Sequence, residues 1–437
     1  MTFLIISLCI IGLILLISWG KINPFLAFLF ISIVTGVLLG IPFIKVVGSV
    51  QKGMGDTLGS LVVIIVLGAM LGKLVADSGA AQKIADVMMQ AFGTKYIQWA
   101  LLVTGFIIGI PLFYGVGFVL VVPLIFSVSY QYKLPAVYIG LPMLAALSVT
   151  FGFLPPHPGP TALVMQFNAN LGMTLLYGLI LAVPAIIIAG PLFSKTLKHI
   201  HSQPLEAFVA IRLPAEQLPG TAKSFISALL PVILLMAATI IPLVIKLPPN
   251  INSIVLFLAE PAIVMIIALA YATYSIGLQQ GMSMKNIMAI YADSIKEVAG
   301  ILLIIGSAGS LKQVLIDSGV SGQIATQLNG LSMHPLLLAW MIAAVIRVCV
   351  GSATVAGLTA AGIVAPLIAK SGVNPNLMVL SIGAGSLALS HVNDSGFWLF
   401  KEYFNLSIKD TVRSWTLMET IVSLVGLAGV FILELFI

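Results

Sequence analysis

The chain has 437 residues, of which 60% are hydrophobic and only 8% are charged, and its mean hydropathy is +1.16. Soluble globular proteins carry about 25% charged residues, so this composition excludes a soluble globular protein and indicates an all-α polytopic membrane protein. The net charge of +6 does not indicate a nucleic-acid-binding protein, because the basic residues are dispersed through short loops without interleaved aromatic residues.

The first part of the chain, residues 1–193, contains apolar runs of about the 20 residues that a bilayer-spanning helix requires. They predict membrane spans at 2–19, 22–40, 58–76, 135–152 and 171–193. A further apolar run at 98–130 is too long for one span, and the sequence I-P-L-F-Y-G-V-G at 110–117 interrupts it. Two half-depth helices that form a re-entrant hairpin are favoured there, with two complete crossings as the alternative.

The span that starts at 135 runs into the sequence F-G-F-L-P-P-H-P-G-P-T at 151–161. Each of its four prolines lacks a backbone donor and clashes with the preceding helical turn, so the helix cannot continue through them. Unpaired backbone groups are costly in lipid, and irregular backbone is therefore expected inside the protein or beside a water-filled cavity. The sequence predicts a broken helix over 135–168, with a break of the kind at which transporters place a substrate.

The longest polar segment, residues 194–223, is predicted to be a cytoplasmic linker, because about 30 residues are too few for a soluble domain. Its histidines, His199 and His201, are interpreted as residues of a solvated loop. Cys9 and Cys349 form no metal-ligand spacing either, so the sequence predicts neither a metal site nor a cofactor.

The second part of the chain, residues 224–437, repeats this pattern. A re-entrant hairpin is predicted at 335–369, where G-S-A-T-V-A-G at 351–357 interrupts a long apolar run. A broken helix is predicted over 376–404, interrupted by H-V-N-D-S-G at 391–396. The remaining apolar runs predict membrane spans at 224–247, 253–279, 296–316 and 413–436.

Matching residues in the two parts indicate an internal duplication. Asp77-Ser78-Gly79 corresponds to Asp317-Ser318-Gly319, 240 residues later, and Pro135 corresponds to Pro375 at the same spacing. Each part has five predicted crossings, and an odd number inverts the second part relative to the first. With the N-terminus outside, twelve basic residues fall in the inside loops and four in the outside loops, which favours this orientation. The sequence therefore predicts two inverted repeats.

Four breaks, at 110–117, 152–161, 351–357 and 391–397, are predicted to meet near the middle of the membrane. Half-helix N-termini at such breaks direct partial positive charge towards anionic groups, and exposed backbone N–H groups can bind a carboxylate. The polar, histidine and glycine residues of these breaks, with Arg347 nearby, are the predicted substrate-binding residues: Tyr114, Gly115, Gly117, His157, Thr161, Arg347, Ser352, Thr354, His391, Asn393 and Ser395.

Ionisable residues at membrane depth are candidates for function by default. Arg347 either holds a substrate carboxylate through two hydrogen bonds or forms a structural ion pair with a buried acid. Asp394 is either a proton carrier or substrate-hydroxyl acceptor, or the N-cap of a short helix over 395–404. His157 and His391, which titrate near neutral pH, either relay protons or only satisfy freed backbone groups.

The sequence contains none of the motifs G-x-x-x-x-G-K-[ST], H-E-x-x-H and G-x-S-x-G. Without an ATP-binding signature or a soluble domain to carry one, primary active transport would need a partner subunit. The other two absences argue against an intramembrane hydrolase. The sequence therefore predicts a transporter rather than an enzyme.

Four stretches carry a resemblance to a known family. They are L-G-A-M-L-G-K-L-V-A-D-S-G-A-A-Q-K-I-A at 67–85, G-F-L-P-P-H-P-G-P-T-A at 152–162, G-S-A-T-V-A-G at 351–357 and H-V-N-D-S-G-F-W-L-F-K-E-Y-F at 391–404. Through them the chain resembles the gluconate:proton symporter family of bacterial inner-membrane permeases over essentially its whole length. The resemblance implies proton-coupled uptake of gluconate or a related substrate; members also handle idonate, fructuronate or D-serine.

A more distant resemblance links the chain to the divalent-anion:sodium symporters. It implies hairpins and broken helices in a mobile domain that moves against a scaffold, as in elevator-type transporters, and a homodimer is expected on this ground alone. Two positions depart from the gluconate family pattern: Phe151 stands where members often have a histidine, and Val350 where they often have a glutamine. Both changes remove a polar group near the predicted site, and His391 is the hypothetical replacement for the missing histidine.

Three alternatives to a proton-coupled importer of a sugar acid stay open at this point. They are a sodium-coupled organic-anion symporter, since broken helices with exposed carbonyl groups also suit Na⁺, a D-serine permease, and an uncoupled anion channel of the same fold. The predicted partners are a small sugar acid or hydroxylated monocarboxylate, protons and the lipid bilayer, without nucleic acid.

The predicted orientation places the C-terminus outside the membrane. A reporter domain that is active only in the cytoplasm should therefore be inactive when it is fused after Ile437. The same reporter inserted after Glu216, in the predicted linker, should be active and serves as the control. An active C-terminal fusion would contradict the predicted inversion of the two parts.

Overall fold

The computed structural model describes residues 2–112, 114–200, 202, 213–244, 248–319, 333–391 and 394–437, and every regular element in these residues is a helix. The helices of the first part are α1 (Thr2–Ser18), α2 (Pro24–Leu38), α3 (Phe43–Asp77), α4 (Ala80–Phe92), α5 (Ile97–Gly109), α6 (Tyr114–Tyr132), α7 (Ala136–Phe153), α8 (Pro158–Gln166) and α9 (Leu171–Ile187). The helices of the second part are α10 (Thr221–Val244), α11 (Pro249–Ala259), α12 (Pro261–Ala272), α13 (Met284–Asp317), α15 (Pro335–Val350), α16 (Ala353–Ser371), α17 (Pro375–Ser386), α18 (Ser395–Tyr403), α19 (Ile408–Thr411) and α20 (Leu417–Glu434).

Six helical segments of the described chain are long and apolar enough to cross a membrane: Ala136–Gln166, Leu171–Leu197, Thr221–Ala238, Pro261–Gln280, Met284–Asp317 and Ile408–Glu434. Helix α3 would be a seventh, although it bends by 44° between Gly59 and Val62. Helices α1 and α2, at the first two predicted spans, have only 17 and 15 residues.

Two predicted spans differ from the helices that form. The span predicted at 58–76 is the second portion of α3, which already starts at Phe43. Lys45 and Lys52 interrupt the apolar run before residue 58, but lysine is compatible with a helix. The span predicted at 253–279 is divided into α11 and α12 at Glu260, since the residue before Pro261 is pushed out of the helical conformation.

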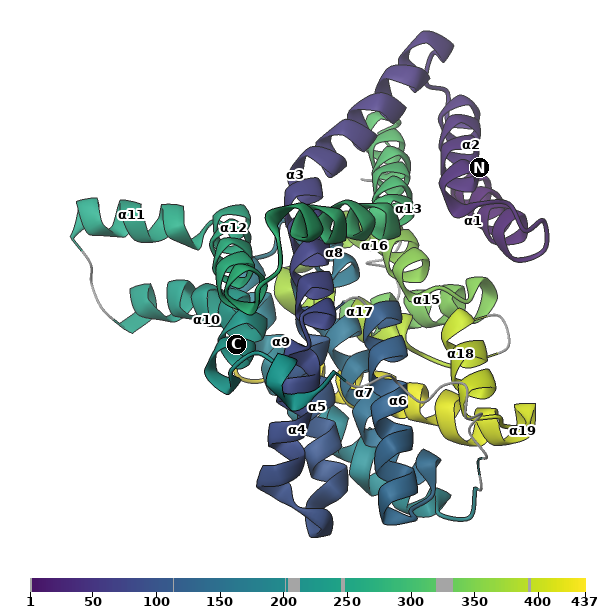
Figure 1. Cartoon of the computed structure of the whole chain (residues 1–437). Coiled ribbons are helices and arrows are strands. Elements are labelled where there is room, and N and C mark those ends of the chain that lie inside the picture. Colours follow the sequence, from purple (N-terminus) through teal and green to yellow (C-terminus); the bar gives the residue numbers. More distant parts are fainter. Residues whose placement is uncertain are drawn as a thin grey trace.

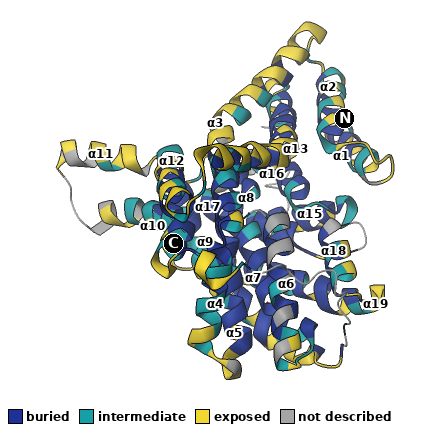
Figure 2. Ribbon diagram, in the orientation of Figure 1, coloured by how far each residue is buried: buried dark blue, intermediate teal, exposed yellow. Residues whose placement is uncertain are grey.

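The long helices α3 and α13 pack against each other along most of their lengths. Figure 1 shows α1 and α2 on one side of this pair, α10, α11 and α12 on the other, and α4, α5 and α6 at the far end of the molecule. Helices α7 and α17 lie in the middle, where Figure 2 shows mostly buried residues, whereas α11 and the first turns of α3 are largely exposed. Exposed apolar helices of this kind are suited to contact lipid.

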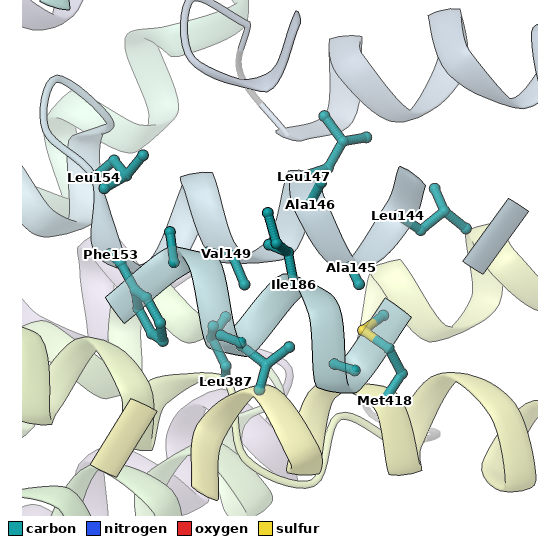
Figure 3. Packing of buried hydrophobic residues seen from close by; sticks show 14 of the residues in the cluster. Leu144, Ala145, Ala146, Leu147, Val149, Phe153, Leu154, Ile186, Leu387 and Met418 are labelled. Atoms are coloured by element: carbon teal, nitrogen blue, oxygen red, sulfur yellow. The ribbon is translucent and has the colours of Figure 1, made fainter. Parts of the chain in front are cut away.

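Helix α7 is the centre of the largest hydrophobic cluster. All of its residues except Tyr138 and Phe151 are buried, as expected for a helix that is apolar on every face. Figure 3 shows its side chains between those of neighbouring helices, including Ile186 of α9 and Met418 of α20. The broken helix that begins with α7 is therefore fixed rigidly in the protein interior.

Helix α7 ends at Phe153, and α8 begins at Pro158. Leu154 is extended, as the proline that follows it requires, and the bond between Pro155 and Pro156 is cis. In the second part, α17 ends at Ser386 and α18 begins after residue 394. The first break thus begins within the polar sequence at 151–161, whereas the second begins before the predicted sequence at 391–396, because α17 already ends at Ser386.

Both predicted hairpins contain two helices that follow each other closely in the sequence. Helix α5 ends at Gly109 and α6 begins at Tyr114, and only Gly351 and Ser352 separate α15 from α16. Gly351 has φ +76°, a left-handed conformation that ends α15 and that glycine adopts without steric cost. Ser352 then caps α16, because its hydroxyl accepts a hydrogen bond from the backbone N–H of Val355 at 3.4 Å.

The close packing of α3 and α13 depends on glycine at the contact. A Cβ atom added to Gly309 would lie 2.6 Å from the carbonyl oxygen of Gly53 and 2.7 Å from the Cβ of Thr57. Gly300, on the same helix, would place an added Cβ in open space.

We expect opposite effects from the two substitutions Gly309→Ala and Gly300→Ala. The first should lower the unfolding temperature, because overpacking costs about 1–3 kcal/mol. The second should leave the unfolding temperature unchanged or raise it, because alanine is a better helix former than glycine by about 1 kcal/mol. Thermal unfolding of the purified protein in detergent measures both, and equal effects would contradict this account of the helix contact.

Candidate functional site

A cavity of about 210 Å³ lies where several of the helix breaks meet, and we call it the site cavity. It is bordered by α6 and α7 of the first part and by the α15–α16 tip, α18 and α20 of the second. Its walls are formed by Tyr114, Ser148, Phe151, Arg347, Gly351, Ser352, Ala353, Thr354, Leu387, Asp394, Gly396, Leu399, Trp415 and Glu419.

A buried ion pair lies on the wall of the site cavity. Arg347, in the last turn of α15, donates from Nη2 to Oδ2 of Asp394, which caps the N-terminus of α18. The arginine is only 4% exposed and the aspartate 8%. Each charge lies at the helix end that the helix dipole favours for it, a cation at a C-terminus and an anion at an N-terminus.

The carboxylate of Asp394 is surrounded by hydrogen-bond donors. Its Oδ2 also accepts from the hydroxyl of Ser390, and its Oδ1 accepts from the backbone N–H of Gly396 at 3.0 Å. Ser390 in turn accepts a hydrogen bond from Nε1 of Trp415 at 2.8 Å. Asp394 is therefore the N-cap of the short helix, as one of the two alternatives from the sequence expects, and its role as proton carrier or substrate-hydroxyl acceptor stays a prediction.

Arg347 keeps donors that its ion partner does not use. Its Nε and Nη1 groups are buried and have no hydrogen-bond partner among the described residues. A buried donor without an acceptor costs about 1–3 kcal/mol, and more when it is charged. An anion in the site cavity would supply the missing acceptors.

A second buried acid lies on α20. Glu419 is 3% exposed, and its Oε1 accepts a hydrogen bond from the hydroxyl of Ser148 on α7. Its other oxygen, Oε2, is buried and has no partner within the described part of the chain. The site cavity therefore contains one carboxylate with all its donors in place and one with a free oxygen.

Aromatic rings form another wall of the site cavity. The ring of Tyr114 lies 5.5 Å from that of Phe151 and 6.2 Å from that of Trp415, measured between centroids. The hydroxyl of Tyr114 is buried without a partner among the residues described. This wall adds apolar surface and a hydroxyl group to the charged groups of Arg347, Asp394 and Glu419.

Among the predicted site residues, Tyr114, Arg347, Ser352, Thr354 and Asp394 line the site cavity. Gly115 and Gly117 lie in the first turn of α6 but are not lining residues, and Asn393 and the side chain of Ser395 lie outside the described residues.

Both predicted histidines contact backbone carbonyl groups and do not line the site cavity. Nε2 of His157 lies 2.8 Å from the carbonyl oxygen of Gly109, and Nε2 of His391 lies 3.0 Å from that of Val348. Thr161 is buried and does not line the site cavity, and its hydroxyl has no partner among the described residues. The contacts of the histidines match the alternative in which they satisfy backbone groups freed by the helix breaks.

The described residues include no group of three or more His, Cys, Asp or Glu side chains that could hold a metal ion. The site cavity instead combines one guanidinium, two acids and several hydroxyl groups, and the guanidinium is the group that suits a small polar anion.

The family to which the chain belongs follows from its similarity to known proteins. A family model described as GntP family permease matches residues 1–436. The chain belongs to the GntP family of permeases. It is therefore a transporter rather than an enzyme, and with its apolar helices it is a multi-pass protein of the bacterial inner membrane.

Individual GntP permeases are similar over the full chain. A high-affinity gluconate transporter of Escherichia coli K12 is 47% identical over 100% of both chains, and a Gnt-II system L-idonate transporter of the same strain is 45% identical over 98% of both. A gluconate permease of Bacillus subtilis is 45% identical over 100% of both chains. The suspected family resemblance is thereby confirmed.

Solved structures share the fold of this GntP permease at low sequence identity. The Alcanivorax borkumensis YdaH transporter matches with a TM-score of 0.64 and 16% identity, covering 97% of each chain. Neisseria gonorrhoeae MtrF matches with a TM-score of 0.59 and 13% identity, covering 90% of this chain and 83% of the other.

Sequence reasoning missed Glu419, Ser148 and Trp415 as residues of the permease site. Glu419 did carry a signal, because an acid within a predicted membrane span is a candidate for function. Ser148 and Trp415 carried none, since a serine or tryptophan in an apolar run most often has a structural role.

Proposed function

We propose that this permease imports gluconate or a closely related sugar acid together with protons across the inner membrane. The observation that carries the proposal is the buried guanidinium of Arg347, a residue that lines the site cavity and keeps two donors without partners among the described residues. Similar permeases named as gluconate and L-idonate transporters, at 47% and 45% identity, support a six-carbon hydroxy acid as the substrate.

The site cavity can accommodate the two ends of such a molecule differently. The substrate carboxylate would accept hydrogen bonds from Nε and Nη1 of Arg347, in the planar fork that suits a carboxylate. The substrate hydroxyl groups would contact Ser352, Thr354 and the hydroxyl of Tyr114, while the free N–H groups at the start of α16 add positive potential. A volume of about 210 Å³ suits a small molecule, since the pockets that hold drug-sized ligands have roughly 300–1,000 Å³.

Inverted repeats and elevator-type movement are part of the proposal. Helices α3 and α13 have 35 and 34 residues, and both end at an Asp-Ser-Gly sequence. Helices α6 and α16 have 19 residues each, and the short helices after the two breaks, α8 and α18, have nine each. These paired lengths support duplication of 1–193 and 224–437 around the linker at 194–223, with re-entrant hairpins at α5–α6 and α15–α16.

A homodimer is proposed on the distant resemblance to elevator-type transporters. Cross-linking of the protein in native membranes, followed by mass determination of the purified product, tests it. A product with the mass of one chain at every cross-linker concentration would contradict this part of the proposal.

Removal of the guanidinium should weaken substrate binding. Arg347→Gln should raise the Kd for gluconate by at least about tenfold, because hydrogen bonds to charged groups contribute about 1.5–3 kcal/mol. Arg347→Lys should have an intermediate effect, since an ammonium retains the charge but not the planar fork. Calorimetric titration of the purified protein measures both, and Arg413→Gln, at an exposed arginine, is the control.

The glutamine variant leaves Asp394 buried without its cation, which by itself lowers stability. The double variant Arg347→Gln/Asp394→Asn restores electrical neutrality and should fold, yet it should bind gluconate no better than the single variant. Wild-type affinity in the double variant would show that Arg347 does not hold the substrate.

Proteoliposomes with an imposed pH gradient, acidic outside, should accumulate labelled gluconate above its external concentration without sodium. Coupling of this kind follows if proton and substrate binding together permit the transporter to change sides. Accumulation that follows only a sodium gradient would replace the proton with Na⁺, and equilibration without accumulation would indicate a channel.

A further inference from the structure

We infer that the coupled proton is carried by Glu419 rather than by Asp394, the acid that the sequence places most plainly in a helix break. The inference rests on the proposed function, since it identifies the proton-binding group of the same site. It follows from the different surroundings of the two carboxylates that line the site cavity.

Asp394 is unsuited to gain and lose a proton during transport. Its two oxygens accept hydrogen bonds from Arg347, Ser390 and the backbone N–H of Gly396. A proton on Oδ2 would meet donors from the first two, and it would leave the guanidinium buried without its counter-ion. Breaking a buried ion pair from one side is strongly destabilising, so Asp394 stays the fixed partner of Arg347.

Glu419 can take up a proton without losing any hydrogen bond. Ser148 donates only to Oε1, whereas Oε2 is buried and has no partner among the described residues. The ion pairs of the described chain do not include Glu419, and the nearby guanidinium of Arg347 has its ion pair with Asp394. A proton on Oε2 would neutralise the buried charge and turn this oxygen into a donor, and a substrate hydroxyl could accept its hydrogen bond.

The charges of the site link protonation to substrate binding. With both acids ionised, Arg347, Asp394 and Glu419 together carry one net negative charge, and with Glu419 protonated they carry none. An anionic substrate meets less repulsion in the neutral arrangement, and the low dielectric of the buried site strengthens the difference. Linkage is reciprocal, so a bound substrate anion favours protonation of Glu419 by the same factor by which protonation favours the substrate.

Few other ionisable groups face Glu419. Tyr114 of α6, Arg347 of α15 and Asp394 share the site cavity with it. Helix α17, which packs against α20, has no ionisable side chain in its sequence. Other ionisable residues lie on neighbouring elements or near the ion pair, but they do not line the cavity. They are Tyr138 of α7, Tyr177 of α9, His334 and Cys349 of the α15 region, His391, and Arg413 before α20.

The proposed cycle moves one proton with one substrate anion. Water on the outer side supplies a proton to Oε2 of Glu419, the substrate carboxylate binds to the free donors of Arg347, and the loaded site becomes open to the inner side. The substrate leaves first or together with the proton, which passes from Oε2 to water inside. The pair between Arg347 and Asp394 stays intact throughout.

The test compares Glu419→Gln with Asp394→Asn. Glutamine resembles the protonated carboxyl in shape and charge, so the first variant should bind gluconate with an affinity that no longer depends on pH. It should also exchange internal for external gluconate in proteoliposomes, while pH-driven accumulation is lost. In the wild type, the affinity should increase on acidification by up to about tenfold per pH unit, the limit for linkage to one proton.

Asp394→Asn should give a different result. Without its carboxylate, Arg347 is no longer held at the cavity wall, so gluconate binding should be weak at every pH. Glu434→Gln is the matched control, because it neutralises a partly exposed carboxylate on the same helix, away from the site cavity. This control should retain both the affinity and the accumulation of the wild type.

If Glu419→Gln does not fold, a second variant tests whether Glu419 carries the proton. Ser148→Ala removes the hydrogen bond donated to Oε1 and leaves every charge in place, so the pH at which the affinity changes should move upwards. An unshifted pH profile in this variant would overturn the assignment, and so would pH-driven accumulation by Glu419→Gln.

Exchange without accumulation in Asp394→Asn would place the proton on that residue instead. Failure of the proposed function itself gives another pattern, in which the wild type does not bind gluconate or accumulates it without a pH gradient.

Discussion

The pairing of Arg347 with Asp394 is the interaction on which the site depends. A guanidinium and a carboxylate can be buried in the interior of a membrane protein only when each supplies the counter-charge of the other. The pair connects the end of α15 to the start of α18, and so holds the α15–α16 tip beside the helix break that precedes α18. Tyr114 and Ser148, from α6 and α7, complete the cavity from the first part of the chain.

The ion pair does not satisfy all the hydrogen-bonding groups of its two side chains, and the groups left over are the ones that could bind a substrate. The two carboxylate oxygens of Asp394 accept hydrogen bonds from three donors, whereas Nε and Nη1 of Arg347 have no acceptors among the described residues. A purely structural pair would satisfy both partners, because unpaired buried donors lower stability. Oε2 of Glu419, which also lines the cavity, likewise lacks a hydrogen-bond partner among the described residues. In the proposed transport cycle, a hydroxylated carboxylate would bind to the free donors of Arg347 and a proton to the free oxygen of Glu419.

Several elements followed directly from local sequence. The prolines between Phe153 and Thr161 end α7, and Gly351 ends α15 in a left-handed conformation, since both effects depend only on the residue and its neighbours. The limits of α3 were predicted less well, because hydropathy identifies apolar runs and not the charged turns that precede Gly59. The histidines were ambiguous from sequence, since their role depends on the carbonyl groups that approach them.

The sequence by itself determined the membrane class, the positions of the helix breaks and the family, because each is encoded in hydropathy, in proline and glycine, or in contiguous motifs. Only the tertiary structure decided which acid pairs with Arg347 and which acid keeps a free oxygen. The partners are 47 residues apart for Arg347 and Asp394, and 271 residues apart for Ser148 and Glu419. Contacts over such separations are set by how the helices pack, and no local periodicity or propensity specifies them.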